Sequence, residues 1–335
     1  MSIDVEELEH GAFDEWNGWV ERSGDATPFH RGGALEAQAD STGADLHALV
    51  GYKGQEPVGL FPIFEQERGP LTVGVSPPTS LGVPRLGPVS LNMNGLKQRK
   101  AERRRWRFIE GCLDWIDEHC AARYVHVATV GPYRDLRPFK WSGADVTPEY
   151  TYVVDLEPEP EDLLMEFSSD ARQNVRGTDD DAYEIEVGDA DDVASIADQV
   201  RARYDAQGET LRMPRVFPQD LYDRLPDGAV RPYVCHVDGE YAGGILTVED
   251  ETRIYRWLGG AKPDLDLPVN DLLDWHVMTD ARKRGRREYD LVGAGERRIS
   301  RYKAKFGPSL ETFHFVEAGP WPVRSLVDLY VRYRP

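Results

Sequence analysis

Alternating apolar and polar positions mark two stretches of the chain. Residues 46–64 read LHALVGYKGQEPVGLFPIF, with a polar turn at Lys53-Gly54-Gln55. Residues 232–250 read PYVCHVDGEYAGGILTVED, with Asp238-Gly239 at the corresponding place. Two alternating runs joined by a short turn that contains glycine are typical of a β-hairpin. The pattern therefore predicts two hairpins, one in each half of the chain.

The segments after each hairpin repeat in the same order. Each hairpin is followed by a strand, a helix with apolar side chains at three- and four-residue spacing, a second strand, an irregular segment and a final strand. The ranges are 71–76, 97–120, 123–131, 132–143 and 149–156 in the first copy, and 252–260, 268–284, 287–295, 296–307 and 311–318 in the second. The repeat predicts two copies of one α/β unit.

A chain of 335 residues also favours two domains, because single cores stop growing at about 250–300 residues. We expect an N-terminal domain at 1–148, a C-terminal domain at 149–320 and, within 321–335, an amphipathic helix that packs back on the domains. The longest apolar run, at 58–64, is too short to span a bilayer. Because the acidic N-terminus lacks the pattern of a secretory signal, we expect a cytoplasmic location.

The charge balance is strongly acidic. Asp and Glu number 59 against 40 Lys and Arg, of which only eight are lysines, and the formal net charge is −19. Acid excess with arginine favoured over lysine is typical of a salt-loving microbe, such as a haloarchaeon, and the charge then reports habitat rather than partner. The alternative is an ordinary acidic mesophilic enzyme.

Basic residues are concentrated in two segments. Residues 97–107 hold seven and residues 282–305 hold ten. In an acidic protein this favours an anionic partner, such as a phosphate-bearing lipid or nucleotide carrier, or tRNA. The alternative is a solvated helix face on which these arginines pair with acids such as Glu110.

Other kinds of site find little support in the sequence. The three cysteines form no CxxC pair, and Cys112 and Cys120 would lie about 12 Å apart along one helix. The spacing predicts neither a disulfide nor a structural zinc site, and no metal site is expected. A dinucleotide loop that began at Gly293 would need glycine at 298, where the chain has Arg298.

Five short motifs, in this order and spacing, resemble the FemXAB-like branch of the GNAT acyltransferase superfamily, which includes peptidoglycan-bridge aminoacyltransferases and acyltransferases of exopolysaccharide clusters. They are TPFHRGGALEAQA (27–39), TPEYTYVVDL (147–156), SSDARQNVRG (168–177), YDLVGAG (289–295) and RYKAKFG (301–307). The resemblance covers nearly the whole chain. It implies two tandem GNAT-like domains that face each other across a cleft, each a mixed, mainly antiparallel sheet flanked by helices.

The resemblance also implies transfer of an acyl or aminoacyl group to an amine or hydroxyl. The donor, acyl-CoA or aminoacyl-tRNA, would be a co-substrate rather than a tightly bound cofactor. Residues 259–275 lack the glycine-rich pyrophosphate loop that is usual in CoA-binding GNAT proteins. The expected acceptor is a small molecule or a glycan linked to a lipid or nucleotide. We expect no DNA partner, while peripheral membrane contact and tRNA binding stay open.

The site implied by the resemblance lies in the C-terminal copy, where strands 254–260 and 289–295 would part. Glycines at 259, 260, 293 and 295 would let a ligand approach the backbone, or they simply end strands as turn residues. The family's lysine falls on Lys303, three residues before Phe306. That lysine would stabilise a tetrahedral intermediate or bind a phosphate. The alternative is a solvated cationic loop.

Further residues complete the predicted site. Asp290 is the nearest carboxylate and would serve as general base, or would only cap the glycine turn. Tyr255 and Trp257 share one side of a strand and would line the acceptor site, or pack in the core. The remaining candidates for substrate binding are Phe306 and four basic residues: Arg172, Arg176, Arg298 and Arg301. A rival from another class is a catalytically idle tandem-GNAT protein that binds RNA or an anionic polymer.

Overall fold

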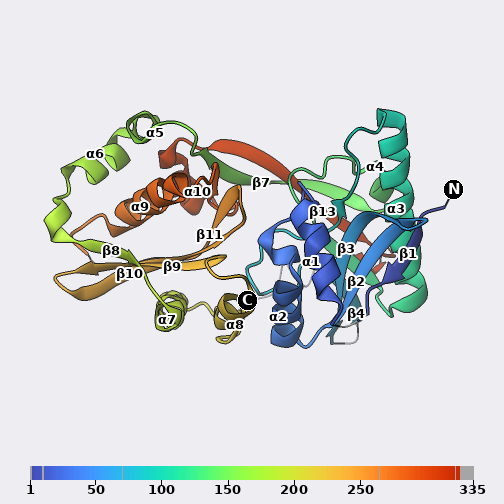
Figure 1. The fold of residues 1–335 in the computed structure, drawn as a ribbon. Helices are drawn as coiled ribbons and strands as arrows, with labels where there is room; N and C mark the ends of the chain where they lie inside the picture. Colours follow the sequence, from blue (N-terminus) through green and yellow to red (C-terminus); the bar gives the residue numbers. More distant parts are fainter. Residues whose placement is uncertain (1, 10, 70, 264, 321, 325–335) are drawn as a thin grey trace. The chain divides into compact units, whose positions relative to one another are not determined.

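The computed structural model describes residues 2–9, 11–69, 71–263, 265–320 and 322–324 (Figure 1). These residues form two compact units. Unit 1 comprises the described parts of 1–79, 83–149 and 312–335, and unit 2 comprises those of 80–82 and 150–311. Each unit is a mixed, mostly antiparallel sheet flanked by helices, which confirms the predicted fold class. The predicted domain boundaries stay predictions, because a compact set of contacts need not fold alone.

The sheet of unit 1 follows the predicted hairpin and strands. Its strand order is β1-β2-β3-β4-β6-β13. All neighbours are antiparallel except β4 and β6, which are parallel. The bounds are β1 Asp4–Glu7, β2 Asp45–Lys53, β3 Glu56–Arg68, β4 Leu71–Ser76, β6 Tyr124–Ala128 and β13 Ser309–Ala318, and the short β5, Val89–Ser90, pairs with β3.

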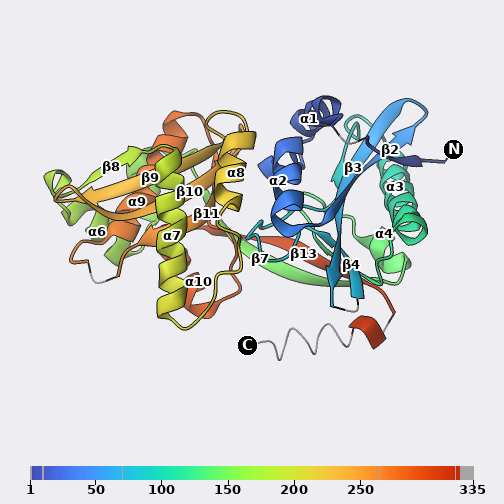
Figure 2. The same cartoon turned by 90° about the horizontal axis from the view of Figure 1, so that it is seen from below.

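Helix α3 (Gln98–His119) makes the crossover from β4 to its parallel neighbour β6. It packs closely on the hairpin because Gly51 and Gly59 leave room for the ring of Phe108: a Cβ on either glycine would lie 2.3–2.4 Å from that ring. Helices α1 (Phe13–Arg22) and α2 (Gly32–Thr42) cover the other face of β2 and β3 (Figures 1 and 2).

Unit 2 repeats this plan. Its strand order is β8-β9-β10-β11-β12-β7, and only β11 and β12 are parallel. Helix α9 makes the crossover between them. The bounds are β7 Asp145–Asp155, β8 Glu184–Val187, β9 Val230–Val237, β10 Glu240–Glu249, β11 Arg253–Ala261, α9 Val269–Lys283 and β12 Glu288–Asp290.

The helices of unit 2 lie on both faces of its sheet. Helices α7 and α9 both contact β9, β10 and β11, from opposite sides (Figure 1). Helix α7 spans Ala190–Ala206. The other helices of this unit are α5 Pro160–Glu166, α6 Ser169–Gly177, α8 Phe217–Arg224 and α10 Arg297–Lys303, which is followed by a 3-10 turn, Ala304–Phe306. No helix among the residues that the structure describes is long and apolar enough to cross a membrane.

The final strand of each copy pairs in the other unit, which the repeat did not predict. Strand β7 follows the first copy, yet its residues Val153–Asp155 pair with β12. Strand β13 follows the second copy, yet its residues Phe315–Ala318 pair with β6. The sequence pattern predicts these strands but not their neighbours, because a strand's alternation indicates a half-buried position only.

Two segments predicted as irregular contain helices. Residues 132–143 hold α4 (Arg137–Trp141), and residues 296–307 hold α10 and the 3-10 turn. Both helices are short, with at most two turns, so their apolar periodicity is too brief to recognise. The helix predicted within 321–335 lies outside the described residues, apart from the helical residues 322–324.

Candidate active site

Strands β11 and β12 pair over only three residues and then part. The parallel ladder joins Arg253–Tyr255 to Glu288–Asp290, while β11 continues to Ala261. The chain after β12 turns away through Val292 and Gly293, whose φ values are 56° and 87°. A β-branched residue in the left-handed region is a genuine outlier, so this turn is held by its surroundings. The gap predicted between these strands is present.

Lys303, on α10, lies at this turn. Its Nζ donates hydrogen bonds to the carbonyl oxygens of Val292 (2.7 Å) and Gly293 (3.0 Å). Burial and then the positive charge of Arg256 lower the pKa of this lysine to about 8. The predicted cationic loop is thus part of a helix, and its ammonium group is fixed where the two strands part.

A buried polar network, which sequence reasoning missed, lies next to Lys303. The carboxylate of Asp274 on α9 accepts hydrogen bonds from Arg256 Nε (2.7 Å) and from the hydroxyls of Tyr289 (2.6 Å) and Tyr302 (2.7 Å). Asp274 is fully buried. Because its charge is paired and hydrogen-bonded, it can hold Arg256 inside the unit. Two of the four residues belong to motifs quoted above, but nothing in their spacing indicates the pairing.

Arg203, on α7, is a second residue that the sequence did not single out. A Cβ on Gly260 would lie 2.8 Å from its Nη1. No hydrogen bond or ion pair to Arg203 occurs among the described residues. Burial and then the charges of Arg256 and Arg298 lower its pKa. Arg203, Arg256, Arg298 and Lys303 are here called the cationic cluster. Arg256 pairs with Asp274 and Arg298 with Glu296 (3.6 Å), so the charges of Arg203 and Lys303 are the ones that favour an anionic ligand.

Asp290 is fully buried and is held by several donors. Its carboxylate accepts hydrogen bonds from Thr151 Oγ1 (2.7 Å) and from the backbone N–H of Val292 (2.8 Å), and Arg253 Nη1 lies 3.5 Å away. Thr151 Oγ1 in turn accepts a hydrogen bond from the N–H of Gly293 (2.8 Å). These contacts favour the alternative of a carboxylate that caps the glycine turn over that of a general base.

For the predicted aromatic and glycine residues, the alternatives are a place at the ligand site or a structural role in the core and in turns. Tyr255 and Trp257 are 4% and 7% exposed, and Trp257 Nε1 donates to the carbonyl of Gly82 (3.0 Å), so both are largely packed. A Cβ on Gly259 would lie 2.2 Å from the carbonyl oxygen of Gly244, so Gly259 allows β10 and β11 to approach. Of the four predicted glycines, at 259, 260, 293 and 295, only Gly293 combines a positive φ with open space at its Cβ position.

Phe306 lies in the core of unit 2 rather than at a surface that a substrate could touch. It is fully buried, and its ring packs edge-on against Phe167 (5.2 Å) and Tyr302 (5.4 Å between centroids). Its predicted role in binding substrate does not fit this position. The phenylalanine instead anchors α10 and thereby positions Lys303.

The four predicted basic residues fall into two groups. Arg172 and Arg176, on α6, contact α5: Arg172 donates to the carbonyl of Met165 (3.0 Å), and Arg176 pairs with Glu161 (2.5 Å). Arg298 and Arg301, together with Arg297, line an open hollow of about 650 Å³. Of the two pairs, only Arg298 and Arg301 therefore lie on α10, the helix that carries Lys303.

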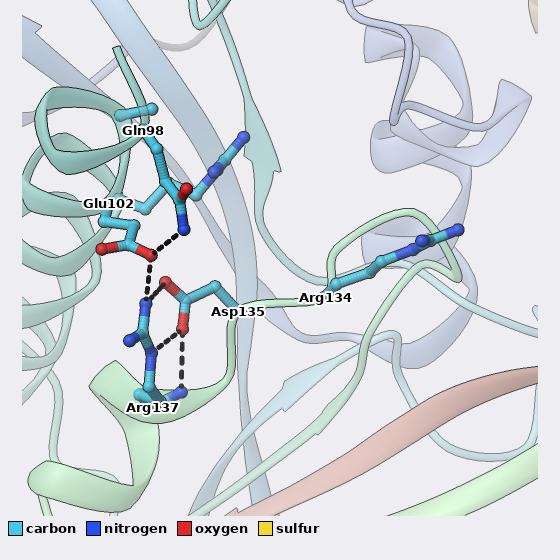
Figure 3. A pocket seen from close by; sticks show the side chains of 7 residues that line it. Gln98, Glu102, Arg134, Asp135 and Arg137 are labelled. Carbon is cyan, nitrogen blue, oxygen red and sulfur yellow. Dashed lines mark hydrogen bonds and ion pairs between the residues drawn. The ribbon is translucent and has the colours of Figure 1, made fainter.

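Within the basic segment of unit 1, residues 97–107, an ion pair to an acid is found at Arg104. Arg104 pairs with Glu56 (3.0 Å), while Arg137 pairs with Asp135 (2.8 Å) and Glu102 (3.0 Å) at the wall of a pocket of about 340 Å³. Figure 3 shows the contacts of Arg137 with Asp135 and Glu102, with Arg134 pointing away from them. Arg137 lies outside the segment, and the acid that pairs within it is Glu56 rather than the predicted Glu110, so the alternative of a solvated, paired helix face stays a prediction.

The sequence of unit 2 identifies its class. Residues 167–304 match the family model described as Acetyltransferase (GNAT) domain. This range includes β11, the start of the gap, α9 and Lys303. This stretch is therefore similar to a GNAT acetyltransferase domain, as the motif resemblance implied. No curated protein matches the chain in sequence.

Solved structures extend the likeness to nearly the whole chain. The structure of FemX is 13% identical, with a TM-score of 0.72, and the match covers 93% of this chain and 96% of that one. L-PGS from Bacillus licheniformis is 12% identical (TM-score 0.60, 96% of both chains). A tandem GNAT protein from the clavulanic acid biosynthesis pathway is 13% identical (TM-score 0.57, 95% and 99%). At such identities these likenesses show the fold alone.

Proposed function

We propose that the chain is an acyl- or aminoacyltransferase of a salt-loving organism, in which Lys303 assists transfer to an amine or hydroxyl of a phosphate-linked cell-surface or glycan precursor. The observation that carries the proposal is the position of the Lys303 ammonium group, fixed by two carbonyl oxygens where β11 and β12 part. The GNAT match covers this residue.

The chemistry follows from where negative charge develops. When the amine or hydroxyl of the acceptor attacks the acyl carbonyl, the carbonyl oxygen becomes an oxyanion. The acceptor then loses its proton, and the donor's leaving group departs. A buried ammonium group aimed at that oxygen stabilises the tetrahedral intermediate more than the substrate. Asp290 stays a proposed base, although its hydrogen bonds favour the capping role.

The cationic cluster supports an acceptor or donor that carries phosphate. Arg203 has no acid partner among the described residues, and its charge adds to those of Arg256 and Arg298. Guanidinium groups bind phosphate through paired hydrogen bonds, which persist at molar salt because they act at short range. One structural neighbour is described as the C-terminal domain of a putative lysylphosphatidylglycerol synthetase. That name denotes a phospholipid that carries a lysyl group. Acyl-CoA and aminoacyl-tRNA both stay open as donors.

The test is substitution of Lys303 in an assay that follows both donors. Purified protein is incubated with labelled acyl-CoA or aminoacyl-tRNA and with extracts of nucleotide- and lipid-linked precursors, and the labelled product is quantified. We expect Lys303→Met to lower the transfer rate about 10²–10³-fold while donor binding persists. Lys283→Met, which removes an exposed lysine of α9, is the matched control and should keep full activity. Unchanged product formation by Lys303→Met would refute the proposal.

The pH profile offers a second readout of the same prediction. The ordinary lysine pKa of 10.5 falls to about 8 here, so the ammonium form is lost as the pH rises through about 8. If that form is the active one, transfer should decline above this pH. Lys303→Arg keeps its charge at every accessible pH, so any activity it retains should not show this decline. A wild-type rate that stays constant to pH 10 would contradict the role.

The rival function, an idle protein that binds RNA or an anionic polymer, is favoured by the open hollow that Arg297, Arg298 and Arg301 line. It predicts binding without turnover. Replacing these three arginines with glutamine would then abolish polymer binding. Lys303→Met would have no measurable effect on product, because the wild-type protein would form none. The two functions are therefore separated by which variant loses which activity.

A further inference from the structure

Three potential metal ligands from different elements of unit 1 converge at one place. His47 lies on β2, Glu65 lies on β3 and Cys120 directly follows α3. One ligand atom from each residue lies within 4.8 Å of the other two. Imidazole nitrogen, carboxylate oxygen and cysteine sulfur together form a mixed donor set of the kind that zinc sites use.

The sheet register explains why two of these side chains meet. Asp45 pairs with Glu65, and His47 pairs with Ile63, so Glu65 and His47 are diagonal neighbours on one face of the sheet. Helix α3 packs on that face and ends at His119, which delivers Cys120. The N–H of Ala121 donates to Glu65 Oε1 (2.9 Å) and fixes the carboxylate.

The hydrogen bonds of His47 leave one ring nitrogen facing a carboxylate. Its Nδ1 lies 2.8 Å from Glu7 Oε1, and we assign the proton to Nδ1, which donates to that carboxylate. The other nitrogen, Nε2, is buried, has no hydrogen-bond partner and lies 3.5 Å from Glu65 Oε2. A lone pair opposite a carboxylate is repelled unless a metal ion lies between them or Nε2 itself carries a proton. A carboxylate on the far nitrogen of a histidine is the usual support for a metal ligand.

We propose that His47, Glu65 and Cys120 bind Zn²⁺, with a fourth coordination position left to water, and that Glu7 supports the site through His47. Zinc bonds of about 2.0–2.3 Å in a tetrahedron place ligand atoms about 3.3–3.8 Å apart, which His47 and Glu65 already satisfy. The thiolate and imidazole disfavour Mg²⁺ and Ca²⁺, which prefer oxygen. The ion would join β1, β2, β3 and the end of α3, and so stabilise unit 1.

The experiment measures metal binding by the full-length chain without an affinity tag. After treatment with a chelator, Zn²⁺ is titrated by calorimetry, and Co²⁺ is added separately to report the ligands by absorption. We expect one zinc per chain, a higher unfolding midpoint with zinc, and a sulfur-to-cobalt charge-transfer band. No zinc uptake, or the absence of that band, would overturn the proposal. A His47 side chain that is simply protonated between Glu7 and Glu65 would bind no zinc and show no band.

Variants identify the ligands one by one. Cys120→Ser should remove the charge-transfer band and weaken zinc binding at least 100-fold, and Glu7→Gln should weaken it about 10–100-fold because it acts through His47. His119→Gln is the matched control, since its ring stacks on Trp115 beside His47 but belongs to no ligand set. Each metal-free variant must keep the wild-type unfolding midpoint. Equal zinc affinity in Cys120→Ser and His119→Gln would refute the site.

Discussion

Asp274 shows how one buried carboxylate organises the candidate active site. It is 0% exposed, and it accepts hydrogen bonds from one arginine and two tyrosines that come from three different elements. One of them, Tyr302, lies next to Lys303 on α10. The carboxylate therefore connects α9, β11 and the helix that carries the proposed catalytic lysine, and the removal of this charge would leave Arg256 buried and unpaired.

We predict that Asp274→Ala lowers the free energy of unfolding by about 3–5 kcal/mol, because it leaves a buried guanidinium group without its partner. The measurement is urea unfolding at constant salt. Asp198→Ala is the matched control: this residue also lies within a helix, but it pairs with Arg215 at the surface, where the side chains are 57% and 71% exposed. It should cost less than about 1 kcal/mol. Equal losses in the two variants would contradict the importance of burial.

The packing of α3 on the β2–β3 hairpin depends on two glycines. Gly51 and Gly59 lie under the ring of Phe108, and neither has room for a methyl group. The same helix ends beside the proposed zinc site, so its distance from the sheet also sets how closely Cys120 approaches His47 and Glu65. Because these two positions have no side chain, α3, a helix of 22 residues, can lie close to the sheet.

Gly59→Ala should therefore destabilise the chain by about 1–3 kcal/mol, as overpacked cores do. Gly18→Ala provides the control, because Gly18 lies within α1 with no atom within 4 Å of its Cβ position, and alanine should stabilise that helix by about 0.5–1 kcal/mol. In the double variant Gly59→Ala/Phe108→Leu part of the loss should be recovered. Thermal unfolding of the three variants decides, and a neutral Gly59→Ala would show that α3 can shift without cost.

The whole molecule is dominated by its negative charge. A formal net charge of −19 means that exposed carboxylates repel one another in the folded state, where they are held closer than in the unfolded chain. Some of the cations form ion pairs: Arg253, for example, lies between Glu288 (2.6 Å) and Glu311 (3.0 Å). Salt screens the long-range repulsion more than it weakens short, partly buried pairs.

We predict that the unfolding midpoint rises as KCl increases from 0.1 M to 1 M, because the screening length falls from about 10 Å to about 3 Å. The measurement is a thermal scan at several salt concentrations. Repeating it near pH 4, where many carboxylates are protonated, should reduce the salt dependence. A midpoint that is independent of salt at pH 7 would favour the ordinary acidic enzyme over the protein of a salt-loving organism.

Much of the fold is local and could be predicted from the sequence. The helix predicted at 268–284 is α9, Val269–Lys283, and that at 97–120 is α3, Gln98–His119. Periodicity predicts such elements because a helix or strand buries one face wherever it lies. The place of Lys303 came instead from a motif resemblance, and its carbonyl partners could not be predicted, because they depend on the turn after β12.

The sequence by itself determined the two copies of an α/β unit, their hairpins and crossover helices, and the membership of Lys303 in a GNAT-like motif. Only the tertiary structure decided which strands pair, since β7 and β13 each join the sheet of the other copy. It also assembled the cationic cluster, the network of Asp274, and the three ligands that cysteine spacing had argued against. The physical reason is that local patterns fix burial and period, whereas sites form from residues that are distant in sequence and meet only through register and packing.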